Sequence, residues 1–191
     1  MKIACLGWGS LIWKPAELPI ASDWFTDGPW LPIEFAREGD SGELATVICP
    51  GVAEVQVLWA YIAVDTLDAA REALREREGV PSVQPECIGS WPEGPRSPFQ
   101  ATLADWARAQ GLDALVWTAL PPRSRGHNQR KPSAEEALTY LRTLDPKRQA
   151  HARDYIQRTP MSIDTEYRRL IEETLNWRPL PEAALDIGKS A

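Results

Sequence analysis

The chain has 191 residues, of which 43% are hydrophobic and 25% are charged, and its formal net charge at pH 7 is −6. This composition is typical of a folded globular domain and excludes a disordered or membrane-embedded chain. A net negative charge gives no general attraction to phosphate backbones, so we expect neither nucleic acid nor a membrane as a partner.

The cysteines and the start of the chain indicate a reducing compartment. Cys5, Cys49 and Cys87 are odd in number and far apart, which is typical of reduced thiols rather than of a disulfide framework. No signal-peptide pattern opens the chain, and no stretch approaches the ~20 apolar residues of a bilayer-spanning helix, so we expect a cytoplasmic protein. The cysteines and the two histidines also lack metal-ligand spacing, so we expect no metal.

Strands and turns are predicted for the first third of the chain. Residues 2–8 form a short apolar run stopped by glycine, which predicts a strand that ends in a tight turn. After a loop rich in Pro and Trp over 14–30, further strands are predicted over 31–38, 43–49 and 55–64. The last of these has apolar residues at both alternating sets of positions, which predicts a central strand covered on both faces.

Helices dominate the rest of the chain. The first is predicted over 67–78, with Asp65 or Thr66 as its N-cap and Gly79 at its end. Ser97-Pro98 predicts the start of a second helix, and residues 112–120 return to a buried strand. Three further helix starts are indicated by a capping box and by two cap-like pairs: Ser133, Asp145 and Asp164.

These elements predict one mixed α/β domain of the α+β class over residues 1–178. Beyond it, Pro, Ala and Gly predict a loose tail over 179–191.

The turn Gly7-Trp8-Gly9-Ser10-Leu11 is the first candidate site. Two glycines at a strand end let the backbone turn sharply and point successive N–H groups into one concavity, which suits a carboxylate or a phosphate. The spacing completes neither a dinucleotide fingerprint nor a nucleophile elbow. A tight turn with no ligand is the alternative, and it stays open.

Glu78 is the second candidate. Helical spacing directs Glu78 toward the apolar side of the 67–78 helix and Glu76 toward water. Partial burial and the negative end of the helix dipole both disfavour a charged carboxylate at that position, which suits a general acid/base near neutral pH. The alternative is that Glu78 merely pairs with Arg71 or Arg75 at the surface.

A basic loop follows the last predicted strand. It carries four cations among Pro, Gly and Asn, at Arg123, Arg125, Arg130 and Lys131. A solvated loop is the first interpretation, because charge runs usually face water. A lid over an anionic substrate is the second.

One stretch near the N-terminus reads Gly7-Trp8-Gly9-Ser10-Leu11-Ile12-Trp13-Lys14-Pro15. It resembles the opening motif of the γ-glutamylcyclotransferase superfamily, especially of its ChaC-type branch. In that branch a tyrosine-glycine-serine turn precedes Leu-Ile-Trp and a proline. Residues 34–37, 42–44 and 49–50 are similar to the family's second and third strands. Arg77-Glu78-Gly79-Val80 resembles the segment that carries its catalytic glutamate, and the helix led by Asp164 is loosely like its closing helix. The resemblance implies a small barrel-like mixed sheet flanked by helices.

The resemblance also implies an activity. In that family the turn's amides hold the substrate's α-carboxylate, and a glutamate moves protons while the α-amine of a γ-glutamyl group attacks its own γ-carbonyl, which releases 5-oxoproline. Carried over, Gly7, Trp8, Gly9, Ser10 and Leu11 would bind a γ-glutamyl amine or peptide, glutathione among the candidates. Glu78 would be the acid/base, with no metal or organic cofactor. Trp8 replaces the family's tyrosine, so any contact that used a phenolic oxygen as acceptor is lost.

Two other classes of function stay open. A non-catalytic small-molecule-binding or regulatory domain would keep the same fold and pocket. An interaction protein would instead expose Trp13, Trp24 or Trp30 of the Trp-rich loop in a contiguous patch.

Overall fold

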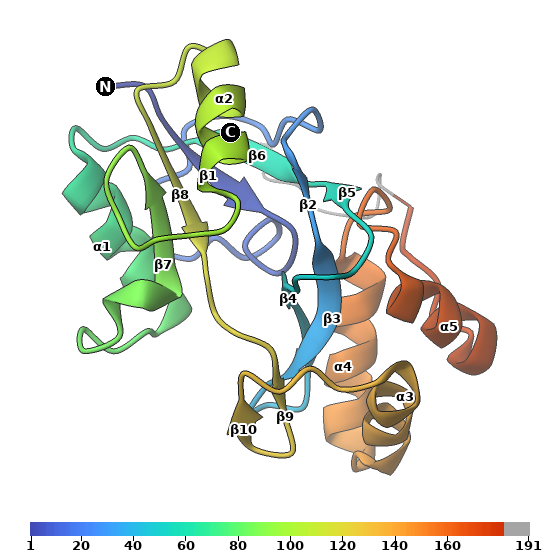
Figure 1. Cartoon of the computed structure of the whole chain (residues 1–191). Coiled ribbons are helices and arrows are strands. Elements are labelled where there is room, and N and C mark those ends of the chain that lie inside the picture. Colours follow the sequence, from blue (N-terminus) through green and yellow to red (C-terminus); the bar gives the residue numbers. More distant parts are fainter. Residues whose placement is uncertain (182–191) are drawn as a thin grey trace.

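The computed structural model describes residues 1–181, which fold into a mixed α/β structure (Figure 1). Its first sheet has the strand order β6-β1-β8-β7. The strands are β1 (Ile3–Gly7), β6 (Leu58–Tyr61), β7 (Ile88–Trp91) and β8 (Ala114–Thr118). β1 pairs antiparallel with β6 and parallel with β8, and all five of its residues are buried. The predicted first strand and the predicted strand over 112–120 are therefore both confirmed.

Two helices pack around the first sheet. α1 (Leu67–Glu78) begins at Thr66, whose hydroxyl accepts from the Ala69 N–H at 3.2 Å, and ends at Gly79 in the left-handed conformation. This helix packs on β7 and β8 through Ala70 and Leu74, so the predicted helix and its end are confirmed. α2 (Gln100–Ala109) begins three residues after the predicted start at Ser97, and a single apolar core joins both helices to the sheet.

The second sheet has the strand order β10-β9-β3-β4 and a separate core. Its strands are β3 (Ile33–Glu38), β4 (Leu44–Ile48), β9 (Arg123–Ser124) and β10 (His127–Asn128). Three helices pack on one side of it, α3 (Ala134–Thr143), α4 (Pro146–Arg158) and α5 (Glu166–Leu175), and Figure 1 shows them grouped away from α1 and α2. The capping box at Ser133 and the cap at Asp145 are confirmed, whereas Thr165 rather than Asp164 caps α5.

The single strand predicted over 55–64 is wrong. Residues 55–56 form β5, which pairs with β2 (Trp30–Leu31) in a two-stranded sheet, and β6 belongs to the first sheet. β6 is an edge strand of that sheet rather than a central one. The Trp-rich loop covers the outer edge of β6 through isolated bridges at Ile20 and Phe25. The apolar pattern over 55–64 therefore indicates that the strand is buried, not that it is central in the sheet.

The predicted set of strands also missed three that the structure contains. β7 has no strand-like alternation, because Gly89 and Ser90 stand at its centre; the Trp117 ring occupies the space that a side chain at Gly89 would need. β9 and β10 form a short hairpin inside the predicted basic loop. Within residues 1–181 the strands pair into three separate sheets. The α+β class is therefore observed, whereas these pairings do not form the barrel-like sheet that the resemblance implies.

The last described residues are hydrogen-bonded to α4. The Gln157 side-chain amide donates to the Arg178 carbonyl oxygen, and the Leu180 N–H donates to the Gln157 carbonyl oxygen at 2.8 Å. The predicted tail over 179–191 lies largely outside the described residues.

A buried carboxylate joins β3 to α5. One oxygen of Glu34 accepts from the Phe35 N–H at 2.8 Å and from the Thr165 hydroxyl, and the other accepts from the Tyr167 N–H at 3.3 Å. Burial raises the pKa of Glu34, and these hydrogen bonds oppose that rise in part. Glu34 therefore gives a hydrogen-bond acceptor to the first turn of α5, and the cost is the burial of an ionisable group.

This raised pKa gives the first prediction. The folded state holds the Glu34 proton more tightly than the unfolded chain, so the stability that this proton contributes is fully present below the usual value of 4.5 and is lost as pH rises through the folded pKa. The free energy of unfolding of the wild type should therefore fall relative to that of Glu34→Gln as pH rises from the usual value of 4.5 through the raised pKa. Denaturant unfolding across this range measures the difference.

Glu54→Gln, at an exposed position, is the control and should show no such trend. A difference between Glu34→Gln and wild type that stays constant with pH would contradict the assignment.

Candidate functional site

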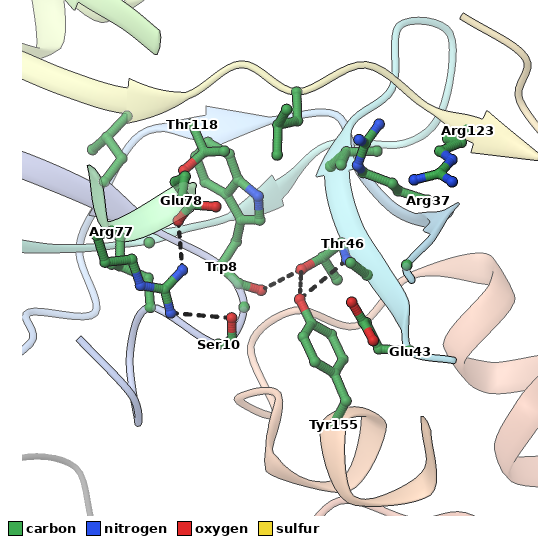
Figure 2. A pocket seen from close by; sticks show the side chains of 18 of the residues that line it. Trp8, Ser10, Arg37, Glu43, Thr46, Arg77, Glu78, Thr118, Arg123 and Tyr155 are labelled. Carbon is green, nitrogen blue, oxygen red and sulfur yellow. Dashed lines mark hydrogen bonds and ion pairs between the residues drawn. The ribbon is translucent and has the colours of Figure 1, made fainter. Parts of the chain in front are cut away.

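A cavity of about 260 Å³ lies between the first sheet and the second (Figure 2). Gly7, Trp8, Gly9, Ser10 and Leu11 line it together with Glu78, so the structure brings all the sequence-predicted candidates to one place. Side chains from β3, β4, β9 and α4 close the other side of the cavity, notably Arg37, Glu43, Thr46, Arg123 and Tyr155.

The two glycines of the turn are required by close packing. Neither has a positive φ. A Cβ at Gly7 would lie 2.6 Å from the Trp24 ring, and a Cβ at Gly9 would overlap the Tyr155 hydroxyl and the Thr46 side chain. The sequence predicted a sharp bend here, and the structure shows that the glycines also let neighbouring side chains reach the backbone.

The turn presents N–H groups that the rest of the described chain does not use. Its own hydrogen bonds run from the Ile12 N–H to the Gly9 oxygen at 3.0 Å and from the Lys14 N–H to the Ser10 oxygen at 2.8 Å. Within residues 1–181 the N–H groups of Gly9 and Leu11 have no hydrogen-bond partner. Two unused amides within three consecutive residues at a cavity wall suit an anionic oxygen.

A chain of hydroxyl groups supports the turn from the opposite side. The Thr46 hydroxyl donates to the Trp8 carbonyl oxygen at 3.1 Å, so the Tyr155 hydroxyl donates to Thr46 Oγ1 at 3.1 Å. The Thr46 N–H in turn donates to the Tyr155 oxygen at 3.3 Å. Burial raises the pKa of Tyr155, so this hydroxyl stays protonated and keeps its role as a donor.

Arg77 joins the end of α1 to the turn. Its guanidinium donates to Glu78 Oε1 at 2.5 Å, to Ser10 Oγ at 3.2 Å and to the Lys14 carbonyl oxygen at 2.7 Å. The side chains of Arg77 and Glu78 are only 9% and 13% exposed, so the ion pair is largely shielded from water.

The alternative pairing that was open for Glu78 is wrong. Arg71 pairs with Asp68, and Arg75 pairs with Glu72 and Glu76 along the outer face of α1. Arg77, the residue next to Glu78, is its partner.

The opposite side of the cavity carries further charges, of which only Arg123, as part of the basic loop, was considered from the sequence. Arg37 donates to the Pro121 carbonyl oxygen at 2.8 Å, and Arg123 pairs with Asp40 at 2.8 Å. Burial, with a smaller contribution from the neighbouring Arg123, lowers the pKa of Arg37. One oxygen of Glu43 is shielded from water, forms no hydrogen bond and lies 3.4 Å from His151 Nε2. These residues come together only because β9 pairs with β3, and no local motif signals that pairing.

Cys5 lies in β1 close enough to Glu78 to respond to its charge. Burial raises the pKa of the Cys5 thiol strongly, the charge of Glu78 raises it further, and Arg77 opposes the rise. A thiol that stays protonated is a poor nucleophile, so Cys5 is a packing residue here. All three cysteines are buried free thiols.

The basic loop is only partly solvated, and one of its cations reaches the cavity. Arg125 and Arg130 pair with Glu136 at the start of α3, and Lys131 lies over the Tyr167 ring. Arg123 alone of the four cations lines the cavity.

The Trp-rich loop packs mostly inward. Trp24 is buried and Trp13 is half-buried, with its ring edge against Tyr155, whereas Trp30 is 55% exposed. The three tryptophans therefore do not form one exposed patch. In the described part of the chain, no helix is long and apolar enough to cross a membrane, and no group of three or more His, Cys, Asp or Glu side chains is arranged to hold a metal.

No protein-family model, curated protein or solved structure matches the chain.

The second prediction concerns the hydroxyl chain. Tyr155→Phe leaves the Thr46 N–H without its acceptor and Thr46 Oγ1 without its donor in a buried place, so it should lower the free energy of unfolding by about 1–3 kcal/mol. Denaturant unfolding measures this loss. Tyr61→Phe is the matched control, because the described residues offer the half-buried Tyr61 hydroxyl no hydrogen bond, and it should cost less than about 0.5 kcal/mol. Equal losses in the two variants would contradict the role given to the Tyr155 hydroxyl.

Proposed function

We propose that the chain is a γ-glutamylcyclotransferase-like enzyme that releases 5-oxoproline from a γ-glutamyl amine or peptide. The observation that carries the proposal is that the turn with unused amides and the shielded carboxylate of Glu78 line the same small cavity. In this proposal the three sheets are a divergent form of the barrel-like sheet that the family resemblance implies.

The γ-glutamyl group would bind at the turn. The N–H groups of Gly9 and Leu11 would hold the α-carboxylate, with Ser10 beside them. A cavity of about 260 Å³ has room for a γ-glutamyl group but not for a large cofactor. The α-ammonium would then lie toward Glu78, whose negative charge attracts it.

Glu78 would move the protons of the reaction. Its carboxylate takes a proton from the α-ammonium, and the freed amine attacks the γ-carbonyl carbon of the same molecule. The bond between that carbon and the leaving nitrogen breaks, the ring nitrogen gives up a second proton, and the released amine takes up both protons. One positioned carboxylate contributes about 10²–10⁴-fold to such a reaction. Holding the substrate folded contributes more, because the attack is intramolecular.

Arg77 would be a positioning residue in this mechanism. It holds one oxygen of Glu78 at 2.5 Å and fixes the carboxylate beside Ser10 through the same guanidinium. The other oxygen of Glu78 remains for the proton transfer.

A second candidate function is a binding or regulatory domain that keeps the pocket without turnover. The close ion pair with Arg77 favours this candidate, because it already occupies one oxygen of the Glu78 carboxylate. Trp8 favours it as well, since its indole N–H cannot accept a hydrogen bond.

The third prediction separates the two functions. Purified protein incubated with glutathione and a panel of γ-glutamyl amines should release 5-oxoproline, measured by chromatography. Glu78→Gln should lower kcat by about 10²-fold or more without unfolding the protein, because the amide cannot accept the proton.

Glu76→Gln is the matched control, since Glu76 lies on the same helix with a side chain 67% exposed, and it should keep full activity. Full activity in Glu78→Gln would contradict the proposal that Glu78 transfers protons. If no γ-glutamyl compound turns over but one binds, and Glu78→Gln weakens that binding, the binding function is the correct one.

A further inference from the structure

We propose that Arg37 and Arg123 form an anion-binding site on the opposite side of the cavity from Glu78, and that it selects substrates whose amine half carries a carboxylate. The inference deepens the proposed function and rests on it. It assigns the enzyme to γ-glutamyl amino acids and peptides rather than to γ-glutamyl derivatives of uncharged amines.

The two arginines are placed together by the second sheet. Arg37 and Arg123 are direct partners in the parallel pairing of β3 with β9, and directly paired residues project from the same face of a sheet. Both line the cavity, and Figure 2 shows their guanidinium groups side by side, away from Arg77 and Glu78.

Both guanidinium groups have capacity for a ligand. The hydrogen bonds of Arg37, to Pro121 and to Asn128, use only Nη1, so its Nε and Nη2 have no hydrogen-bond partner within residues 1–181. Arg123 pairs with Asp40, whose side chain is 86% exposed, and such a pair contributes little because water screens it. A carboxylate bound between the two arginines would relieve their mutual repulsion, which also contributes to the lowered pKa of Arg37.

Of the two carboxylates on the same side, Asp40 contacts Arg123 and Glu43 contacts neither arginine. Asp40 faces solvent, and the shielded oxygen of Glu43 lies near His151. In the described residues no carboxylate oxygen comes within 4.0 Å of the Arg37 guanidinium. An arginine that is half-buried without a carboxylate partner is costly to keep unless it binds an anion.

The direction of the substrate leads to the same place. If the turn holds the α-carboxylate and Glu78 exchanges protons with both nitrogens, the reacting atoms lie on the α1 side of the cavity, and the rest of the amine half has the β3 and β9 side to occupy. The amine half then extends toward Arg37 and Arg123. Arginine binds carboxylates through two parallel hydrogen bonds, which gives orientation as well as affinity.

The fourth prediction uses two substrates that differ only by the carboxylate, γ-glutamylglycine and γ-glutamylmethylamide. The wild-type kcat/KM, from the rate of 5-oxoproline release, should be about 10-fold or more higher for γ-glutamylglycine. Arg123→Gln should bring the ratio of the two kcat/KM values close to one.

Arg125→Gln is the matched control, because Arg125 lies on the same hairpin, pairs with Glu136 and does not line the cavity. It should keep the wild-type ratio. Arg37→Lys should give an intermediate ratio, since lysine keeps the charge but loses the two-point contact. Thermal unfolding of each variant establishes that it is folded.

The outcomes separate the two proposals. Turnover of both compounds at equal kcat/KM in the wild type overturns the anion site and leaves the cyclotransferase function standing. If neither compound turns over, the cyclotransferase function fails, and calorimetric titration with the same two compounds decides the anion site. Tighter binding of γ-glutamylglycine that Arg123→Gln abolishes supports the site, whereas equal or absent binding overturns it.

Discussion

The contact on which the site depends is the Arg77 guanidinium, which reaches from the last turn of α1 to the end of β1. It binds the Glu78 carboxylate, the Ser10 hydroxyl and the Lys14 carbonyl oxygen with one rigid, planar group. The position of α1 is set independently, because Ala70 and Leu74 are buried against the first sheet and Gly79 ends the helix. Arg77 links this packing to the turn, because it holds the one carboxylate of α1 that faces inward beside Ser10. Without it, Glu78 would end a surface helix with no fixed relation to Ser10.

The cavity exists because two cores meet there without merging. One core joins the first sheet to α1 and α2, and the other joins the second sheet to α3, α4 and α5. Trp13 packs against both cores, and polar groups complete the contact: the Tyr155 hydroxyl of α4 reaches Thr46 of β4, and Thr46 reaches the Trp8 carbonyl oxygen. Gly9 has no side chain, so this approach is close. The same hydroxyl puts a phenolic oxygen beside the turn, although Trp8 stands where the resembled family has tyrosine.

The sequence was sufficient for features that depend on neighbouring residues. β1, the extent of α1 with its Gly79 end, the capping box at Ser133 and the inward direction of Glu78 all follow from local spacing and cap chemistry. The sequence was insufficient where the structure of a segment depends on residues that are distant in the chain. The 55–64 segment is divided between two sheets because β5 pairs with β2 whereas β6 pairs with β1. β7 is held in a sheet by pairing with β8, although Gly89 at its centre is a poor strand former. For the same reason Arg37, Thr46 and Tyr155 could not be assigned to a site in advance, and Arg123 could be named only as part of a basic loop.

The arrangement of charge in the cavity limits what it can bind. Arg77 and Glu78 form a shielded pair on one side, and neutral hydroxyl groups of Thr46 and Tyr155 separate that pair from Arg37 and Arg123 on the other. A ligand with a single charge would leave one side of the cavity unmatched, and an apolar ligand would leave both unmatched at a desolvation cost. A ligand with a zwitterionic group beside the turn and a second anionic group near Arg37 and Arg123 would match the charges on both sides of the cavity. The cavity is therefore better suited to a small, multiply charged metabolite than to an apolar molecule, whether or not that metabolite is turned over.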